Sequence, residues 1–501
     1  MFNNSSSQSK SAKHATKITH LNSDVNLFSR LYIAGQTRES DMENFFAHEN
    51  HPWPPSLATN GIMHSTCKSD LIECLESLVP FQDIAPTVDA KIIDGASLVH
   101  SLDPKKSNAK EPILTFKNYA DYIFIPAIQR MLQSVHSLDV VWDTFVDNSL
   151  KEQTRQNRGY GTPIKVENAT KLPSNWKNFL RCDKNKDSLF KLLAVSIQEF
   201  QFSSHKQVIS TFDQKVVTSP VACTDVSELH CSHEEADTRL LFHAKHVYNK
   251  GLKKILIRAT DTDVVVIAVA VASALPECEI WVGFGHGNKL RYIACHLLSS
   301  CLGVDASQGL LFFHALTGCD VCSAFHGIGK KRAWTVLNSL PHLQTLFAEL
   351  SKTPSCISSE QFEQLERFTV LLYQRTSDLT SVNDLRTHLF SHNRAIENIP
   401  PTKSALEQHI KRAVYVAGFI WGQTLIANPS IPPPEIWGWK RNERDTSLTP
   451  YWASLPEASK ACRELIKCGC KTSCIRRWCK CVQANLKCTQ LCFCCGQCYR
   501  E

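Results

Sequence analysis

The sequence predicts an α/β fold with a mainly parallel sheet, because three features recur between residues 90 and 284. Short runs of β-branched and apolar residues indicate buried strands, and helix-like stretches separate successive runs. Several of these runs also end in an aspartate. Strands that alternate with helices favour parallel pairing, since two parallel neighbours need a crossover connection. Ligands of such sheets gather at the carboxyl ends of strands, so the terminal acids are candidate site residues.

Individual elements follow from the local patterns. Four strands are expected, at Ala90–Asp94, Leu138–Asp143, Lys254–Ala259 and Glu279–Phe284. A helix is expected around Tyr119–Val135, and beyond Gly327 apolar residues at three and four spacing predict helices at Gln361–Tyr373 and Ser404–Leu425. The longest apolar run, Val264–Leu275, is too short to span a bilayer.

Length and composition predict several domains, since 501 residues exceed the usual span of one hydrophobic core. The predicted divisions are an N-terminal region of uncertain order (1–85), an α/β domain (86–345), a helical extension (346–428), a proline-rich and charged linker (429–461), and a cysteine-rich tail (462–501). The polar N-terminus does not resemble a secretion signal. We therefore expect a protein that is neither secreted nor inserted in a membrane.

Charge and cysteine are concentrated in the tail. The net charge is +7, yet residues 461–501 alone hold eight Lys or Arg against two Glu, and eleven of the 22 cysteines. Such a cation cluster favours a polyanion, either nucleic acid or an anionic membrane, although a short basic tail can also be a solvated or targeting segment. In a reducing compartment, thiols at this density favour a metal over disulfides.

The tail repeats Cys-x-Cys pairs with gaps too short for an apolar core, which indicates zinc. It resembles the tesmin/TSO1-like CXC domain at Cys468, Cys470, Cys474, Cys479, Cys481, Cys488, Cys492, Cys494 and Cys498. The resemblance implies three zinc ions held by nine thiolates, so three thiolates must bridge. Cys494 and Cys495 are adjacent, and either could be the ligand. The alternatives are a zinc knot that only stabilises or mediates protein contacts, and disulfide cross-linking.

The same resemblance implies that the tail binds DNA. Basic residues lie between the cysteines, at Lys471, Arg476, Arg477, Lys480 and Lys487. Their side chains would contact phosphates, which provides affinity without reading the base sequence.

Upstream, acidic residues follow one another in a characteristic order. An aspartate at the end of a strand is most often a helix cap or a turn former, so each acid alone says little. Together Asp94, Asp143, Glu235, Asp237, Asp261, Asp263 and Asp320 occur in the order found in flap endonucleases and PIN-like nucleases. The resemblance covers about residues 90–340 and ends in the element Gly327-Ile-Gly-Lys-Lys-Arg. It implies a PIN-like core that hydrolyses phosphodiester bonds.

The acid set predicts a divalent-metal site, because seven packed carboxylates would repel one another unless cations neutralised them. Oxygen ligands favour Mg²⁺ or Mn²⁺. The resemblance places Asp94, Asp143, Glu235 and Asp237 around one ion, and Asp261, Asp263 and Asp320 around the other.

Two basic elements accompany the acids. The resemblance assigns Gly327, Gly329, Lys330, Lys331 and Arg332 to a helix-hairpin-helix that holds a DNA backbone, although an ordinary turn is the alternative. Lys151, Arg155 and Arg158 share one face of an expected helix. That helix resembles the one that clamps the scissile phosphate in these nucleases, with Lys151 and Arg155 in catalytic roles; a solvated charged face is the alternative. His233, His243, His246 and His314 are expected to be structural.

Three functions remain open from the sequence. The first is a structure-selective, metal-dependent DNA nuclease that its tail targets to DNA in the nucleus. The second is an inactive DNA-binding or chromatin-associated protein, because a nuclease core joined to a CXC tail is similar to transposon-derived proteins that can lose activity. The third is a PIN-type RNA nuclease with the same metal chemistry. The sequence identifies no protein partner.

Overall fold

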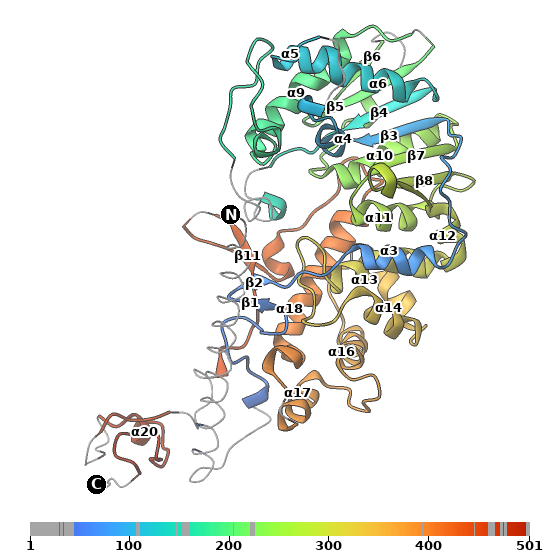
Figure 1. Cartoon of the computed structure of the whole chain (residues 1–501). Coiled ribbons are helices and arrows are strands. Elements are labelled where there is room, and N and C mark those ends of the chain that lie inside the picture. Colours follow the sequence, from blue (N-terminus) through green and yellow to red (C-terminus); the bar gives the residue numbers. More distant parts are fainter. Residues whose placement is uncertain are drawn as a thin grey trace.

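The structure is a computed structural model of the whole chain. It describes residues 30, 34, 45–106, 111–146, 149–152, 161–203, 205–220, 226–392, 394–444, 446–458, 466–470, 474 and 478–496. Figure 1 shows a central sheet with helices on both faces, a helical region beside it, and the cysteine-rich tail at the C-terminal end.

The sheet has seven strands, and most of them are parallel. They are β3 (Ala90–Asp94), β4 (Ser137–Val141), β5 (Gln207–Phe212), β6 (Lys215–Ser219), β7 (Lys254–Ala259), β8 (Glu279–Phe284) and β9 (Arg291–Ala294). Their order is β6-β5-β4-β3-β7-β8-β9, with β6 and β9 pairing antiparallel at the two edges. The predicted α/β class and all four predicted strands are confirmed, whereas β5, β6 and β9 were not predicted.

The order of the strands creates a switch point beside β3. The chain runs outward from β3 through β4 to β5 and β6, and then returns to β7 on the other side of β3. β3 therefore pairs in parallel with both β4 and β7. Connections leave in opposite directions at such a point, which opens a crevice at the carboxyl ends of the strands.

Alternating side chains of the strands build a core on each face of the sheet. On one face Ile93 and Val140 pack with α5 (Phe116–Tyr119), α6 (Ile125–Leu132) and α9 (Asp183–Glu199). The other face packs against a second set of helices, α10 (Ala236–Asn249), α11 (Thr262–Ala272), α12 (Cys295–Leu302) and α13 (Val304–Leu316). Every residue of α11 is buried, which explains the long apolar run in the sequence.

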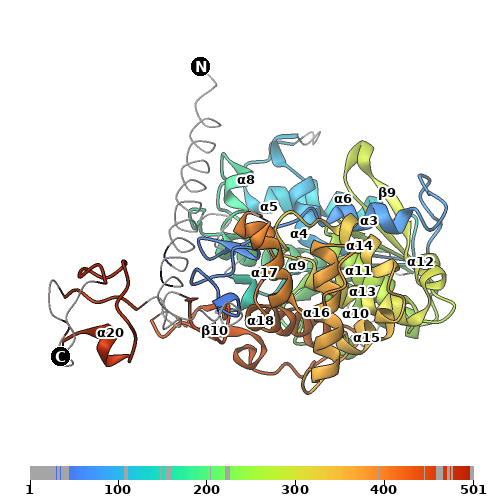
Figure 2. The same cartoon turned by 90° about the horizontal axis from the view of Figure 1, so that it is seen from below.

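A helical layer extends the second core. It comprises α14 (Lys330–Asn338), α15 (Leu343–Leu350), α16 (Ser359–Tyr373), α17 (Val382–Ser391) and α18 (Lys403–Val414). Figure 2 shows these helices gathered on the side of α11 and α13. The predicted helix at Gln361–Tyr373 is confirmed within α16, and the one at Ser404–Leu425 continues after α18 as a π-helix at Tyr415–Trp421. The helix expected around Tyr119–Val135 is present as α5, a π-helical segment at Ala120–Phe124, and α6.

Residues 45–85 also join this core. The short strands β1 (Ala58–Thr59) and β2 (Ile62–Met63) precede α3 (Ser69–Glu76), whose Leu71, Ile72 and Leu75 are fully buried among the core side chains. The domain boundaries drawn from composition stay a prediction. Among the described residues, every helix is too short or too polar to cross a membrane.

Gly95 tests how tightly the switch point is packed. It begins α4 (Gly95–Ser101), and a Cβ atom there would lie 2.3 Å from Cε3 of Trp142. We expect Gly95→Ala to lower the free energy of unfolding by about 1–3 kcal/mol, because the ring has to shift within a packed core. Chemical denaturation measures this. Ser101→Ala, at the exposed end of the same helix, serves as the control. Equal stability of Gly95→Ala and wild type would contradict the packing described here.

Candidate active site

Asp94 and Asp261 lie at the switch point, and each also caps a helix. Asp94 ends β3 and accepts a 3.1 Å hydrogen bond from the backbone N–H of Ser97 in α4. Asp261 follows β7 and accepts a 3.0 Å bond from the N–H of Asp263 in α11. The capping role weighed for isolated aspartates is therefore present. It holds both carboxylates at helix N-termini, where the helix dipole favours negative charge.

Three further acids come from the neighbouring strand end and helix. Asp143 lies two residues beyond β4, and its Oδ1 accepts a 2.8 Å bond from the N–H of Ala236 in α10. Glu235 is the N-cap of α10, and Asp237 lies in its first turn. The bond from Ala236 thus ties the N-terminus of α10 to the end of β4 and brings Glu235 and Asp237 to the same edge of the sheet.

His314 positions Asp263. Both side chains are buried, and Nε2 of His314 donates a 3.0 Å hydrogen bond to Oδ1 of Asp263. Burial holds the pKa of His314 well below its usual range, so the ring is neutral and is not an ion-pair partner. His314 lies in α13, which leads to the loop that contains Asp320.

The structure brings all seven predicted acids into one cluster at this edge. Carboxylate oxygens of Asp237, Asp261 and Asp263 all lie within 4.8 Å of one another. Asp237 therefore lies with two acids that the resemblance places around the other ion, and the partition into two sets stays a prediction.

Burial and neighbouring charges raise the pKa values of three acids in the cluster. Burial, together with the neighbouring Asp143 carboxylate, raises the pKa of Asp94 to about 7. Burial also raises the pKa of Glu235 to about 7, against the opposing charge of Lys151, and raises that of Asp237 well above its usual range. Without further cations, part of the cluster is therefore protonated near neutral pH.

Two lysines enter the cluster. Nζ of Lys68, just before α3, lies 2.8 Å from Asp261, 3.0 Å from Asp263 and 2.9 Å from Asp320. Nζ of Lys151 lies 2.9 Å from Glu235 and 3.6 Å from Asp237. Lys151 was a predicted site residue, whereas Arg155 and Arg158 lie outside the described residues. Lys68 was missed because nothing in its local sequence marks it, and even its nearest carboxylate partner in the chain, Asp261, is 193 residues away.

The predicted phosphate-binding hairpin needs a correction at its basic residues. Gly327 does adopt a positive φ of 68°, and Gly329 caps α14. Lys330, however, is fully buried, and its Nζ donates to the carbonyl of His314 at 2.6 Å and to Thr317 Oγ1 at 2.9 Å.

The two basic residues after Lys330 are also engaged within the chain. Lys331 pairs with Glu73 on the surface at 2.6 Å, and Arg332 donates to the carbonyl of Tyr373 at 3.0 Å. A phosphate contact by Lys330 therefore does not fit this structure, because its ammonium faces the protein interior.

The other three histidines considered from the sequence, His233, His243 and His246, pack within the fold, and their structural role stays a prediction. His243 bonds to the buried Asp139 at 2.7 Å, and His233 bonds to Thr238 and to the carbonyl of Ile426. His246 is buried within α10.

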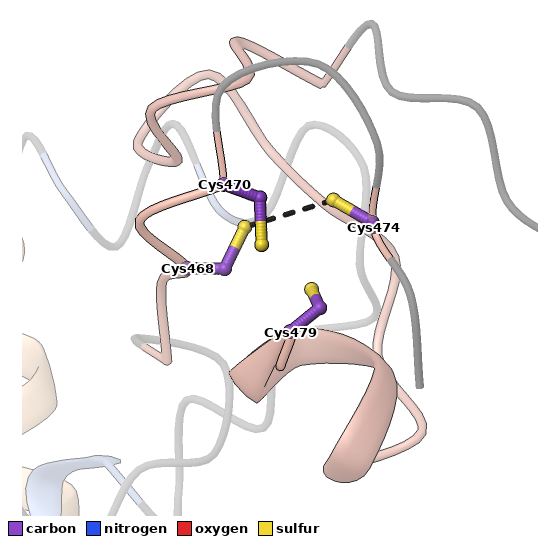
Figure 3. A group of neighbouring side chains, drawn as sticks. All are labelled: Cys468, Cys470, Cys474 and Cys479. Atoms are coloured by element: carbon purple, nitrogen blue, oxygen red, sulfur yellow. Dashed lines mark hydrogen bonds between the residues drawn. The ribbon is translucent and has the colours of Figure 1, made fainter. Parts of the chain in front are cut away.

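The cysteine tail forms a compact thiol cluster. Figure 3 shows Cys468, Cys470, Cys474 and Cys479 around a common centre, with Sγ of Cys468 3.9 Å from Sγ of Cys474. The Sγ atoms of these four residues lie within 4.8 Å of one another. The same holds for two further groups of described thiols: Cys468, Cys481, Cys488 and Cys492, and Cys468, Cys474, Cys488 and Cys494. Cys494 is buried in the cluster, whereas Cys495 is exposed. This geometry favours Cys494 as the ligand.

The basic residues of the tail are described only in part. Lys480 and Lys487 are exposed on the thiol module. Lys471, Arg476, Arg477 and Cys498 lie outside the described residues.

Comparisons with known proteins give structural likenesses only. No family model and no curated protein match the sequence. Among solved structures, the catalytic core of Rad2 in complex with DNA substrate is similar in two crystal complexes: complex III, at 14% identity and a TM-score of 0.35, and complex II, at 12% and 0.33. Each match covers 65% of this chain and 80% of the other. The α/β class is therefore assigned from the order and direction of the strands in the sheet.

The burial of Lys330 gives a direct test of its role. We expect Lys330→Met to lower the free energy of unfolding by about 1–3 kcal/mol, because the carbonyl of His314 and the hydroxyl of Thr317 lose a buried donor. Urea unfolding measures the change. Lys331→Met, on the exposed neighbour, is the control and should unfold like wild type. A Lys330→Met variant of normal stability that has lost affinity for DNA would restore the phosphate-contact interpretation.

Proposed function

We propose that this chain is a divalent-metal-dependent nuclease that hydrolyses phosphodiester bonds in DNA, on a PIN-like core. The observation that carries the proposal is the convergence of seven carboxylates, from five separate segments of the chain, at the switch point of the sheet. Caps and helix packing alone would not require so many acids at one place. Such clusters are typical of sites that bind metal ions and phosphate esters.

The donor set fits Mg²⁺ or Mn²⁺. All seven candidate ligands offer carboxylate oxygens, which hard cations prefer, and Asp237, Asp261 and Asp263 already lie close enough to share an ion. Burial raises the pKa values of Asp94 and Glu235, so a cation bound beside them would stabilise their charged forms. When bound, such ions would activate a water molecule and stabilise the leaving oxygen of a phosphodiester.

The protein's own side chains would organise this site. His314 fixes the orientation of Asp263, and the N–H of Ala236 fixes Asp143. Lys151 lies beside Glu235 and Asp237, so its ammonium could bind the phosphate that enters the site. With Arg155 and Arg158 it would form the basic clamp expected from the sequence.

The tail would bind zinc, and the module that the zinc ions fold would supply affinity for DNA. Three four-coordinate ions need twelve bonds, so nine thiolates suffice when three of them bridge. Cys468, Cys474 and Cys488 each belong to more than one thiol group, which makes them the bridging candidates. Cys498 would then be the fourth ligand of the ion that Cys494 binds. Lys480 and Lys487 lie exposed on this module, and with Lys471, Arg476 and Arg477 they would contact phosphates.

One observation favours an inactive alternative. Lys68 and Lys151 already pair with five of the seven acids. A cluster neutralised in this way could persist in a DNA-binding or chromatin-associated protein on a transposon-derived fold that no longer cleaves. RNA remains an alternative substrate, because the metal chemistry is the same for both backbones.

Isosteric substitution of the acids tests the nuclease proposal. We expect wild type with Mn²⁺ or Mg²⁺ to cleave at least one member of a labelled panel of flap, nicked, duplex and single-stranded DNA and matched RNA. Asp261→Asn/Asp263→Asn should reduce cleavage at least about 100-fold, because the ion loses charged ligands. Asp305→Asn, on the exposed part of α13, is the control. Equal cleavage by wild type and the double variant would point to a contaminating nuclease, and no cleavage by either would favour the inactive alternative.

Zinc content tests the ligand choice in the tail. We expect about three zinc ions per chain by elemental mass spectrometry, given nine thiolates of which three bridge. Cys495→Ser should keep all of them because its thiol is exposed, whereas Cys494→Ser should lose about one ion. The reverse result would assign the ligand to Cys495.

A further inference from the structure

Lys68 has a geometry that is unusual for an ion pair. Its ammonium lies within 3.0 Å of three carboxylates that come from two separate parts of the chain, Asp261 and Asp263 beside β7 and Asp320 after α13. An ammonium has three N–H donors, so one can point at each carboxylate. Only 20% of the side-chain surface is exposed. The lysine is therefore a fixed positive charge inside the site.

The three acids around Lys68 are the set that the resemblance to flap endonucleases places around one divalent ion. An ion among these carboxylates would use the same oxygen lone pairs that now accept from the ammonium. The two cations would also lie close together and repel each other. Lys68 in this position and a divalent ion on these three acids therefore exclude each other.

The backbone that carries Lys68 is held firmly. Leu71, Ile72 and Leu75 of α3 are fully buried, and Glu76 forms a 2.5 Å ion pair with Arg291, the first residue of β9. Moving α3 would expose these apolar side chains to water. The flexible stem of Lys68 is what can move, by rotation about its four side-chain bonds.

We propose that Lys68 is a tethered cation that competes with a divalent ion for Asp261, Asp263 and Asp320, so that the ion binds only when the lysine side chain leaves. The inference rests on the proposed metal-dependent function. Residues 45–85 then have a role at the site, because Lys68 comes from this region. Its charge holds the three acids together without metal and lowers their affinity for the ion. Lys68 is a positioning residue in this scheme.

Metal titration of a charge-neutral variant tests this competition. In Lys68→Gln the stem length is nearly kept and the charge is lost. We expect isothermal calorimetry to show Mn²⁺ binding at least about tenfold tighter than in wild type, since a neighbouring unit charge changes the binding of a proton by one to three orders of magnitude. Lys254→Gln, at the opposite end of β7 in a surface ion pair with Glu279, should bind Mn²⁺ like wild type.

A second measurement uses the wild-type protein and does not depend on the folding of the variant. Acetylation by an amine-reactive reagent, read by mass spectrometry, should modify Lys68 slowly in EDTA and several-fold faster in saturating Mn²⁺. Unchanged Mn²⁺ affinity in a folded Lys68→Gln variant, or continued protection of Lys68 in Mn²⁺-bound wild type, would overturn the competition alone. Failure of wild type and both variants to bind Mn²⁺ would overturn the proposed metal-dependent function together with it.

Discussion

Mutual repulsion among seven carboxylates at one edge of the sheet is the constraint on which the rest of the site depends. Bringing them together costs free energy through burial as well as repulsion, and burial is the main cause of the raised pKa values of Asp94 and Glu235. The fold offsets part of this cost with backbone N–H groups at helix N-termini and with two buried lysines. The remaining negative charge is what a divalent cation would neutralise, and this links the packing of the fold to the proposed chemistry.

The helical layer is connected to the acid cluster by buried hydrogen bonds. Lys330 donates to the carbonyl of His314, and the imidazole of His314 donates to Asp263. This chain of hydrogen bonds connects the glycine-rich turn before α14 with the acid cluster. The motif that resembles a phosphate-binding hairpin therefore also has a local structural task, and its lysine is part of the interior. Burial lowers the pKa of Lys330 to about 7, so the core favours the neutral amine, which can still donate hydrogen bonds.

The chain keeps two kinds of metal ligand apart. Carboxylates gather at the sheet, whereas the described thiols of the tail gather in a separate module after the proline-rich segment. Oxygen ligands favour Mg²⁺ or Mn²⁺, and thiolates favour zinc. Under the proposed function, a division of this kind would allow one site to exchange ions during a reaction while the other held its ions as part of the folded structure.

The sequence by itself determined the α/β class, the four central strands and the spacing of the cysteines, because periodicity, strand ends and ligand spacing are local properties of the chain. The set of seven acids was selected by their order along the chain, which resembles that of flap endonucleases and PIN-like nucleases. Tertiary structure decided the rest. The strands β5, β6 and β9 depend on pairing with distant neighbours, and Lys330 turns inward because α14 packs over α13. Lys68 meets Asp261 across 193 residues, a contact that only the packing of α3 on the core creates. Side-chain partners at such separations leave no local pattern, so the cation at the centre of the acid cluster could be found only in the folded chain.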